Sequence, residues 1–419
     1  MRTSFDAAIV GAGPAGASLA ILLARAGWTV ALIERQPFPR RKVCGECVAA
    51  SNLELLGTLG VGTAFANKAG AELRRVAWLR GSETIVARLP PAAGVHRWGR
   101  ALGREHLDTA LADAAEAAGA TRLQPWTLQS IEGAAGRFLL RVRADTGSPA
   151  DRDHELCAGV VVAAHGSWEP LPSERGERRE TRAASDLFAF KANFRGAALD
   201  ADLLPVLSFA GGYGGMVVAD DGIVTLAGCI RADRLQALRA AVPGARAGDA
   251  FEAMLRQECA GVGAALAAAR RDGAWLASGP LHPGVRVGVD DGVFRIGNAA
   301  GEAHPIVGEG ISMALQSAFV LAALIAPERA ALLDPPSAAA AQRNARRRYA
   351  VLWRRRFARR LAVAAGFAHI AMRPALAAAA WPLVRRWPQI LTAGARFSDK
   401  TRVVPEAAAL SARPLVRES

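Results

Sequence analysis

The stretch FDAAIVGAGPAGASLAILLARAGWTVALIE, residues 5–34, decides the fold of this chain. An apolar run at 7–10, typical of a buried parallel strand, ends at a G-x-G-x-x-G sequence that opens an Ala/Leu-rich helical stretch. A second apolar run at 29–33 ends on an acid, Glu34. Strand, glycine-rich turn, helix, strand and acid follow in the order of a Rossmann-type unit, which predicts an α/β fold with a bound dinucleotide.

Each part of this stretch has a physical role in holding a dinucleotide. The first glycine permits the tight turn, the second lets the backbone approach a pyrophosphate, and the third lets the helix pack closely on the strand. Backbone N–H groups at the helix start face the phosphates, and a carboxylate about 20 residues after the first glycine can accept both ribose hydroxyls. The cofactor-binding residues predicted for this half are Gly11, Gly13, Ala15, Gly16, Glu34 and Arg35.

Composition indicates a globular intracellular protein. The chain has 419 residues, 51% of them hydrophobic, which is enough for two domains with large cores. The first apolar run is the Rossmann strand itself, so we expect no signal peptide. Five cysteines, an odd number without repeated spacing, favour a reducing compartment over a disulfide framework, and we expect a cytoplasmic protein.

Patterns further along the chain predict a second sheet inserted into the first. Strands are expected at 84–89, 138–142, 157–164 and 293–296, and helical stretches at 103–119, 235–269 and 311–326. Between 187 and 230 the alternation of apolar and polar residues, with turn signals, suits a mixed or antiparallel sheet with one covered face.

A second glycine-dense stretch, at 297–312, lies between a predicted strand and a strongly apolar helix. A strand, a glycine-rich loop and a helix beginning at Gly310 form another backbone anion site. Because the adenosine half is already assigned to residues 11–34, this second site indicates a long cofactor with another polar group.

Together the two stretches resemble the flavoprotein hydroxylase superfamily, and within it the geranylgeranyl reductase-like branch. The family's second FAD motif reads G-D, A-A-G, a proline and G-x-G-I, and the matching residues are Gly297-Asn298, Ala299-Ala300-Gly301, Pro305 and Gly308-Glu309-Gly310-Ile311. Lys42-Val43-Cys44-Gly45-Glu46 resembles the K-x-C-G-E of the reductase branch. Arg104 with Asp108 resembles the family's R-x-x-x-D, whose arginine approaches the cofactor.

This resemblance implies FAD as the cofactor and NAD(P)H as a transient electron donor. It implies further cofactor contacts by Arg104, Gly297, Asn298, Pro305, Gly308, Gly310 and Ile311. The catalytic candidates are Cys44, Tyr213 and His304; a packed cysteine, an interfacial tyrosine and a hydrogen-bonded structural histidine are the alternatives. The chain departs from the family at Asn298, where the family has aspartate, and at His165-Gly166, where hydroxylases have D-G.

The predicted architecture combines three parts. A Rossmann-type FAD-binding domain with a parallel sheet comprises 1–75, 100–170 and 280–330. An interleaved mixed β-sheet substrate domain comprises 76–99 and 171–279, and a C-terminal helical region comprises 335–419.

The predicted function is that of an FAD-dependent oxidoreductase of the monooxygenase type. It would hydroxylate, or otherwise oxidise or reduce, a hydrophobic small molecule of aromatic, polyketide-like or lipid character. A flavin-dependent C=C reductase of the geranylgeranyl reductase type is the alternative enzyme, and a membrane-associated electron carrier is the alternative that is not an enzyme.

The net charge of +14 belongs entirely to residues 343–402. These residues form either interfacial helices on an anionic membrane, which would be the inner face of the cell membrane, or helices that pack over the substrate domain and expose arginine. No nucleic-acid partner is expected, because the rest of the chain carries no nucleic-acid fold signature. No metal is expected either, because Cys44 and Cys47 have no second C-x-x-C or histidine pair.

Overall fold

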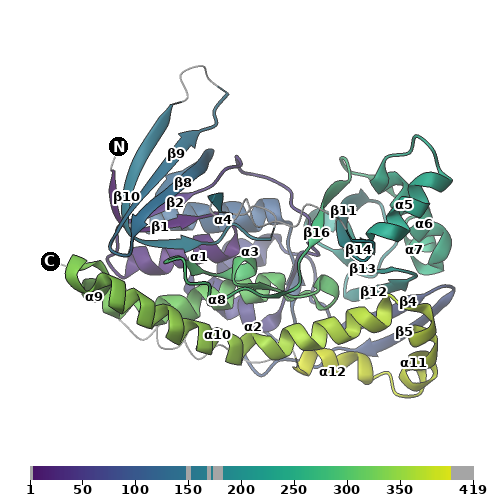
Figure 1. Ribbon diagram of the computed structural model, residues 1–419. Helices are drawn as coiled ribbons and strands as arrows, with labels where there is room; N and C mark the ends of the chain where they lie inside the picture. The colour runs from purple at the N-terminus through teal and green to yellow at the C-terminus, as the bar shows by residue number, and fades with distance from the viewer. Residues whose placement is uncertain (1–2, 148–151, 168–170, 173–182, 398–419) are drawn as a thin grey trace.

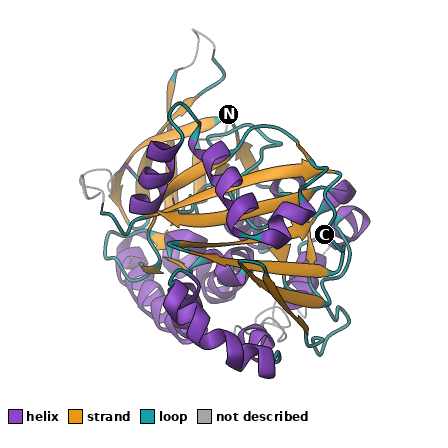
Figure 2. Cartoon of the chain, turned by 90° about the vertical axis from the view of Figure 1, so that its right-hand side faces the viewer, coloured by secondary structure: helices purple, strands orange, loops and turns teal. Residues whose placement is uncertain are grey.

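The computed structural model describes residues 3–147, 152–167, 171–172 and 183–397. Two β-sheets stand side by side, and a long C-terminal helix runs along both of them (Figure 1). Helices lie over the outer sides of the strands (Figure 2). The predicted α/β fold with a C-terminal helical region is confirmed.

The first sheet has the order β7-β2-β1-β10-β9-β8, with β18 paired to β10. Its strands are β1 (Ser4–Val10), β2 (Val30–Ile33), β7 (Thr121–Leu123), β8 (Trp126–Ala134), β9 (Arg137–Ala144), β10 (Asp153–Ala163) and β18 (Phe294–Arg295). All pair in parallel except the hairpin β8–β9, which joins β10 antiparallel. Ala7 and Ile9 of β1 enter one core and Phe5 and Ala8 enter another, so both faces are buried and the strand is apolar from Ala7 onward.

Five helices cover one face of the parallel part of this sheet. They are α1 (Pro14–Arg25), α2 (Ala50–Thr58), α3 (Gly62–Lys68), α4 (Arg104–Ala117) and α8 (Gly310–Ile325). α1 packs against both α4 and α8, and Leu19 of α1, Leu111 of α4 and Phe319 of α8 share one buried core. Both predicted glycine motifs therefore open onto helices that are packed against each other.

The second sheet has the order β15-β11-β14-β13-β12-β4-β5, with β16 paired to β11. Its strands are β4 (Arg75–Arg80), β5 (Glu83–Arg88), β11 (Leu187–Arg195), β12 (Leu203–Phe209), β13 (Gly212–Val218), β14 (Val224–Arg231), β15 (Arg270–Arg271) and β16 (Leu276–Leu281). Only β12 and β4 pair in parallel; the other pairs are antiparallel. Helices α5 (Ala232–Ala241), α6 (Ala247–Glu258) and α7 (Ala260–Ala265) belong to this half of the molecule.

Two short ladders complete the sheets, β3 (Cys47–Val48) with β6 (Arg100–Ala101) and β17 (Gly284–Val285) with β19 (Gly301–Glu302). The sequence predicted one helical stretch at 235–269, but the chain there forms the three helices α5, α6 and α7. Strand β8 was not predicted. The strand expected at 84–89 is β5, and those at 138–142 and 157–164 lie within or overlap the longer β9 and β10.

The C-terminal region contains α9 (Arg329–Leu333), α10 (Pro335–Ala371), α11 (Pro374–Arg386) and α12 (Ile390–Phe397). With 37 residues, α10 is about 55 Å long. It begins against β10, where Gln342 Nε2 donates to the Gly159 carbonyl oxygen at 2.9 Å, and it ends beside β12 and β13. Tyr349, Trp353 and Phe357 are buried in the core of the first half. Ala368 and Ala371 are buried against residues of the second sheet, so this helix packs on both halves of the protein.

Within the described residues, one helical segment has the length and composition to cross a membrane. It is Gly310–Leu333, and 78% of its most apolar window is buried inside the protein. Helices α10 and α11, which are bent by 104° where they meet, pass the same criterion only if the two are counted as one broken span.

Candidate functional site

The turn between β1 and α1 is tight, and its backbone packs closely at two of its three glycines. Gly11 has φ +106°, and a Cβ there would lie 2.6 Å from the Ala164 carbonyl oxygen. A Cβ on Gly16 would lie 1.9 Å from the Gly11 carbonyl oxygen. At Gly13 the nearest atom would be Nη2 of Arg104, at 3.6 Å. The first and third glycines are thus required by close backbone packing, while at the second a Cβ would meet only an ordinary contact with the Arg104 side chain.

Glu34 lies at the end of β2, beside this turn. Its carboxylate accepts hydrogen bonds from the backbone N–H of Ala12, at 2.9 Å, and of Gln36, at 3.0 Å. The Arg40 guanidinium lies 3.5 Å from the same carboxylate. A small cavity beside the turn is lined by Gly11, Gly13, Glu34, Arg35, Arg40, Lys42, Trp126, His165 and their neighbours. The sequence pattern identified neither Arg40 nor Trp126, although the basic run at 40–42, in the loop after Glu34, pointed to an anion-binding role.

The second glycine motif meets the first in space. It consists of the 3-10 turn η3 (Gly297–Ala299), β19, the 3-10 turn η4 (Pro305–Val307) and the start of α8. A Cβ on Gly297 would lie 2.9 Å from Cβ of Ala15, in the first turn of α1. Gly308 has φ +63°, and Gly310, the first residue of α8, has open space around it. Two helix N-termini, α1 and α8, therefore belong to one site.

Asn298 is held by a chain of polar side chains. Its amide Nδ2 donates to Oγ of Ser167 at 2.8 Å, and Ser167 Oγ donates to the buried carboxylate of Glu302 at 2.7 Å. Ser167 directly follows His165-Gly166, so these hydrogen bonds connect the segment after β10 to the second glycine motif. An uncharged amide thus occupies the position where the family has an aspartate.

A large cavity of about 510 Å³ connects both motifs with the second sheet and the C-terminal helices. Among the predicted site residues it is lined by Gly13, Ala15, Cys44, Arg104, Tyr213, Gly297, Asn298, Pro305, Gly308, Gly310 and Ile311. The other lining residues are mostly apolar, and they include Trp78, Phe190, Val206, Met216, Phe367, Leu383 and Leu391. Gly16 lies beneath the turn, and His304 contacts the cavity residue Tyr213. The remaining predicted residues line one cavity or the other.

Cys44 and Arg104 face each other at the cavity wall. Arg104 forms a bidentate ion pair with Asp108, with both nitrogen–oxygen distances at 2.7 Å, and it interacts with the Cys44 thiol. Burial alone would lower the pKa of the Arg104 guanidinium, but the charge and hydrogen bonds of Asp108 raise it above its usual value. Arg104 is therefore a fixed positive charge between Cys44 and Gly13.

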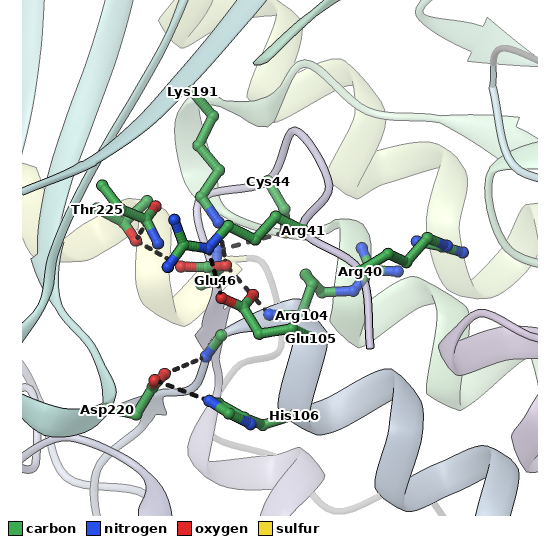
Figure 3. A network of polar contacts seen from close by, with 12 residues as sticks. Arg40, Arg41, Cys44, Glu46, Arg104, Glu105, His106, Lys191, Asp220 and Thr225 are labelled. Atoms are coloured by element: carbon green, nitrogen blue, oxygen red, sulfur yellow. Dashed lines mark hydrogen bonds and ion pairs between the residues drawn. The ribbon is translucent and has the colours of Figure 1, made fainter. Parts of the chain in front are cut away.

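Behind Cys44 lies a buried ion pair that joins the two sheets (Figure 3). The Glu46 carboxylate pairs with the Lys191 ammonium of β11 and accepts hydrogen bonds from the Thr225 hydroxyl and the Arg104 backbone N–H. Both charged side chains are buried. Glu46 also has φ +59°, an uncommon conformation for a non-glycine residue that the surrounding contacts must hold. Nothing in the sequence pairs Lys191 with Glu46, since 145 residues separate them.

Tyr213 and His304 form a second polar pair at the cavity. The Tyr213 hydroxyl lies 3.1 Å from Nδ1 of His304. Burial raises the pKa of Tyr213 well above its usual value and lowers the pKa of His304, so the pair is neutral at pH 7. Burial also raises the pKa of the neighbouring Cys229 thiol to about 12. In the described ranges, no three His, Cys, Asp or Glu residues are grouped as metal ligands would be.

The chain matches known proteins in sequence and in fold. The sequence model of the FAD binding domain family matches residues 4–224. A menaquinone reductase of Mycobacterium tuberculosis is 29% identical over 180 residues, which are 42% of each protein. A kynurenine 3-monooxygenase of Xanthomonas oryzae pv. oryzae is 32% identical over 190 residues, 41% of this chain and 39% of that protein. The matches thus span less than half of these relatives' lengths.

A solved structure with a similar fold is a geranylgeranyl bacteriochlorophyll reductase-like protein from Thermoplasma acidophilum. It has a TM-score of 0.64 and 17% sequence identity, and the similarity covers 95% of this chain and 100% of that one. At this identity the likeness concerns the fold alone.

Proposed function

The chain belongs to the FAD binding domain family, and on that premise we propose that it is an FAD-dependent reductase of an elongated apolar molecule. The observation that carries the proposal is the apolar extension of the cavity of about 510 Å³. Beyond the glycine motifs, where FAD would lie, it is lined by apolar side chains of the second sheet and of α10–α12, among them Trp78, Val206 and Leu383. An apolar pocket beside the flavin position fits a hydrophobic substrate, and an electron carrier has no use for it. The menaquinone reductase relative directs the choice towards an isoprenoid or quinone-like lipid.

The residues at the motifs fit FAD. Because Gly13 has no side chain, a pyrophosphate can approach the backbone at the N-terminus of α1, and Glu34 would accept the adenosine ribose hydroxyls. The backbone N–H groups of Gly310 and Ile311, at the N-terminus of α8, would stabilise negative charge on the reduced cofactor. When bound and reduced by NAD(P)H, FAD supplies a hydride.

Cys44 is the proposed proton donor for double-bond reduction. An activated C=C bond that accepts a hydride on one carbon needs a proton on the other, and the Cys44 thiol lines the cavity where it can supply that proton. The thiolate that remains is stabilised by the Arg104 guanidinium, and solvent restores its proton. Tyr213, neutral and hydrogen-bonded to His304, would orient the substrate from the opposite sheet.

A Cys44→Ala variant is expected to be reduced by NAD(P)H as fast as the wild type but to transfer the hydride about 100-fold more slowly, because general-acid catalysis is lost. Stopped-flow absorbance under argon separates the two half-reactions, with menaquinone as the acceptor. Cys157→Ala, which removes an exposed thiol on β10, is the control. A wild-type rate of hydride transfer in Cys44→Ala would contradict Cys44 as the proton donor. Tyr213 would then be the next candidate, and Tyr213→Phe tests it.

Hydroxylation is the second candidate, favoured by the similarity to kynurenine 3-monooxygenase. The same assay distinguishes the two reactions, because a reductase turns over under argon and consumes one NAD(P)H for each double bond removed. A monooxygenase is inactive under argon and incorporates one oxygen atom into the product in air.

We further propose that the substrate enters from an anionic membrane at its cytoplasmic face. Leu376 and Leu383 lie on one outward side of α11, and Trp387 directly follows this helix. Leu383 is 50% exposed and Trp387 is 51% exposed. Leu383 also lines the cavity, so this side borders its opening. Exposed Arg385 and Arg386 flank it, and residues 335–397 contain no Asp or Glu. Five free cysteines fit a reducing compartment.

A Trp387→Glu variant is expected to bind anionic vesicles about tenfold more weakly, because it loses an interfacial aromatic ring and gains a repelled charge. Co-sedimentation with vesicles containing phosphatidylglycerol measures this binding. Val242→Glu introduces the same charge at another exposed apolar residue, at the end of α5, and is expected to bind as the wild type does. Equal binding by all three proteins would refute the membrane proposal without affecting the enzymatic one.

A further inference from the structure

Helix α10 lies outside the residues matched by the family model, yet it inserts a charged side chain into the second cofactor motif. Arg360 of α10 is 4% exposed. Its Nη1 lies 3.6 Å from Oε2 of Glu309, which is fully buried, and it donates to Oε1 of Gln316 in α8 at 2.7 Å. This arginine is therefore part of the core beneath the cofactor loop, unlike its exposed neighbours on the same helix.

The contacts of Arg360 continue through α8 to α2. Gln316 Nε2 donates to Oδ1 of Asn52 at 3.0 Å, and Asn52 Nδ2 donates to Oγ of Ser312 at 2.7 Å. Ser312 is in the first turn of α8, directly after the cavity residues Gly310 and Ile311. The Arg360 guanidinium is thus hydrogen-bonded to α8, the helix whose N-terminus lines the cavity.

Glu309 occupies an electrostatically sensitive position. It is the residue before Gly310, at the N-cap of α8, between the two glycines of the G-x-G-I motif. A carboxylate there would offset the positive potential that the helix N-terminus offers to a reduced, negatively charged cofactor. The positive charge of the buried Arg360 guanidinium beside the carboxylate offsets this negative potential. Because charges interact over several ångströms in the poorly polarisable protein interior, the offset extends to the N-terminus of α8.

We propose that Arg360 is a positioning residue that acts through Glu309 to set the reduction potential of bound FAD. The inference rests on the proposed function in one respect only, that FAD binds with its redox-active part near the start of α8. The C-terminal helical region then contributes to three properties: the reduction potential of bound FAD, the lining of the cavity and the proposed membrane surface.

The test is the midpoint potential of bound FAD, measured by anaerobic dye equilibration at pH 8.5. Glu309→Gln removes the negative charge next to the N-terminus of α8 and is expected to favour reduced FAD about tenfold, a rise of about 30 mV for a two-electron couple. Arg360→Met removes the positive charge beside Glu309 and is expected to shift the potential by a similar amount in the opposite direction. The double variant is expected to return to the wild-type potential.

Arg355→Met removes an exposed arginine from the same helix and is expected to leave the potential unchanged. Arg360→Lys keeps the charge and is expected to keep the wild-type potential. Shifts of the same sign in both single variants, or no shift in either with FAD bound, would overturn the inference. If Arg360→Met does not fold, Glu309→Gln decides alone, because an unchanged potential in that variant excludes the coupling. Failure of the wild type to bind FAD would instead overturn the proposed function.

Discussion

A Gly13→Ala variant is expected to fold as the wild type does and to bind FAD on the order of 100-fold more weakly, whereas Gly16→Ala is expected to lose the fold itself. The two substitutions add the same methyl group three residues apart. At Gly13 the methyl has ordinary contacts in the protein, with its nearest neighbour at 3.6 Å, and it occupies the space through which a pyrophosphate approaches the backbone.

At Gly16 the methyl would lie 1.9 Å from the Gly11 carbonyl oxygen and 3.1 Å from Cβ of Ala164. Backbone atoms cannot give way there without moving α1 away from β1 and β10, and this helix is buried along most of its length. The cost is several kcal/mol, a large share of the roughly 5–15 kcal/mol by which proteins of this kind are stable.

Soluble yield, thermal unfolding and an FAD titration of the apoprotein, followed by flavin fluorescence, check this prediction. Gly366→Ala is the matched control, because it adds a methyl to open space within α10, where alanine favours the helix. A Gly16→Ala protein that is as soluble and as stable as this control would contradict the structure of the turn. Normal FAD affinity in Gly13→Ala would contradict the placement of the pyrophosphate.

The second large effect is expected at the buried pair behind Cys44. Lys191→Met leaves the Glu46 carboxylate without its counter-ion in the core between the two sheets, which costs about 3–5 kcal/mol. Thr225 and the Arg104 backbone N–H still donate to the carboxylate, but hydrogen bonds do not replace the missing charge. Because Glu46 and Cys44 are two residues apart, the loop that presents the thiol is expected to loosen together with the sheets.

The Lys191→Met/Glu46→Gln double variant is expected to regain most of the lost stability, since neither side chain then carries an unbalanced charge. Urea unfolding of the apoprotein measures each variant. The control is Lys68→Met, at the end of α3, which removes an exposed lysine and is expected to change stability by no more than about 0.5 kcal/mol. Equal stability of Lys191→Met and Lys68→Met would show that Lys191 does not neutralise Glu46.

Much of the fold was predictable because its signals are local. The apolar runs before and after the first glycine turn became β1 and β2, and the stretch expected as a helix at 311–326 is α8. The stretch at 235–269 was predicted as one helical stretch although Pro243-Gly244, a turn signal, separates α5 from α6, while the break between α6 and α7 at Cys259 carries no such signal. Strand β8 was missed because only part of it alternates between buried and exposed residues.

For the candidate site, the sequence identified the individual motifs but not their surroundings. The motif at Gly11–Gly16 and the motif at Gly297–Ile311 could each be found from turn chemistry and apolar flanks. The cavity residues Trp78, Val206 and Leu391 carry no such pattern, because an apolar side chain in a sheet or helix looks the same in sequence whether it faces a core or a ligand.

Local sequence signals were sufficient to predict the α/β class, the two glycine-rich loops and the basic character of the C-terminal region. Glycine conformation, helix starts and apolar periodicity act over a few residues, so they can be recognised without knowledge of the fold. Which charges are buried and paired depends on contacts between distant segments. Arg360 and Arg359 are adjacent and chemically identical, yet Arg360 pairs with Glu309 in the core while Arg359 is exposed. The rotation of α10 on α8 sets this difference, and that rotation results from packing between segments far apart in the chain.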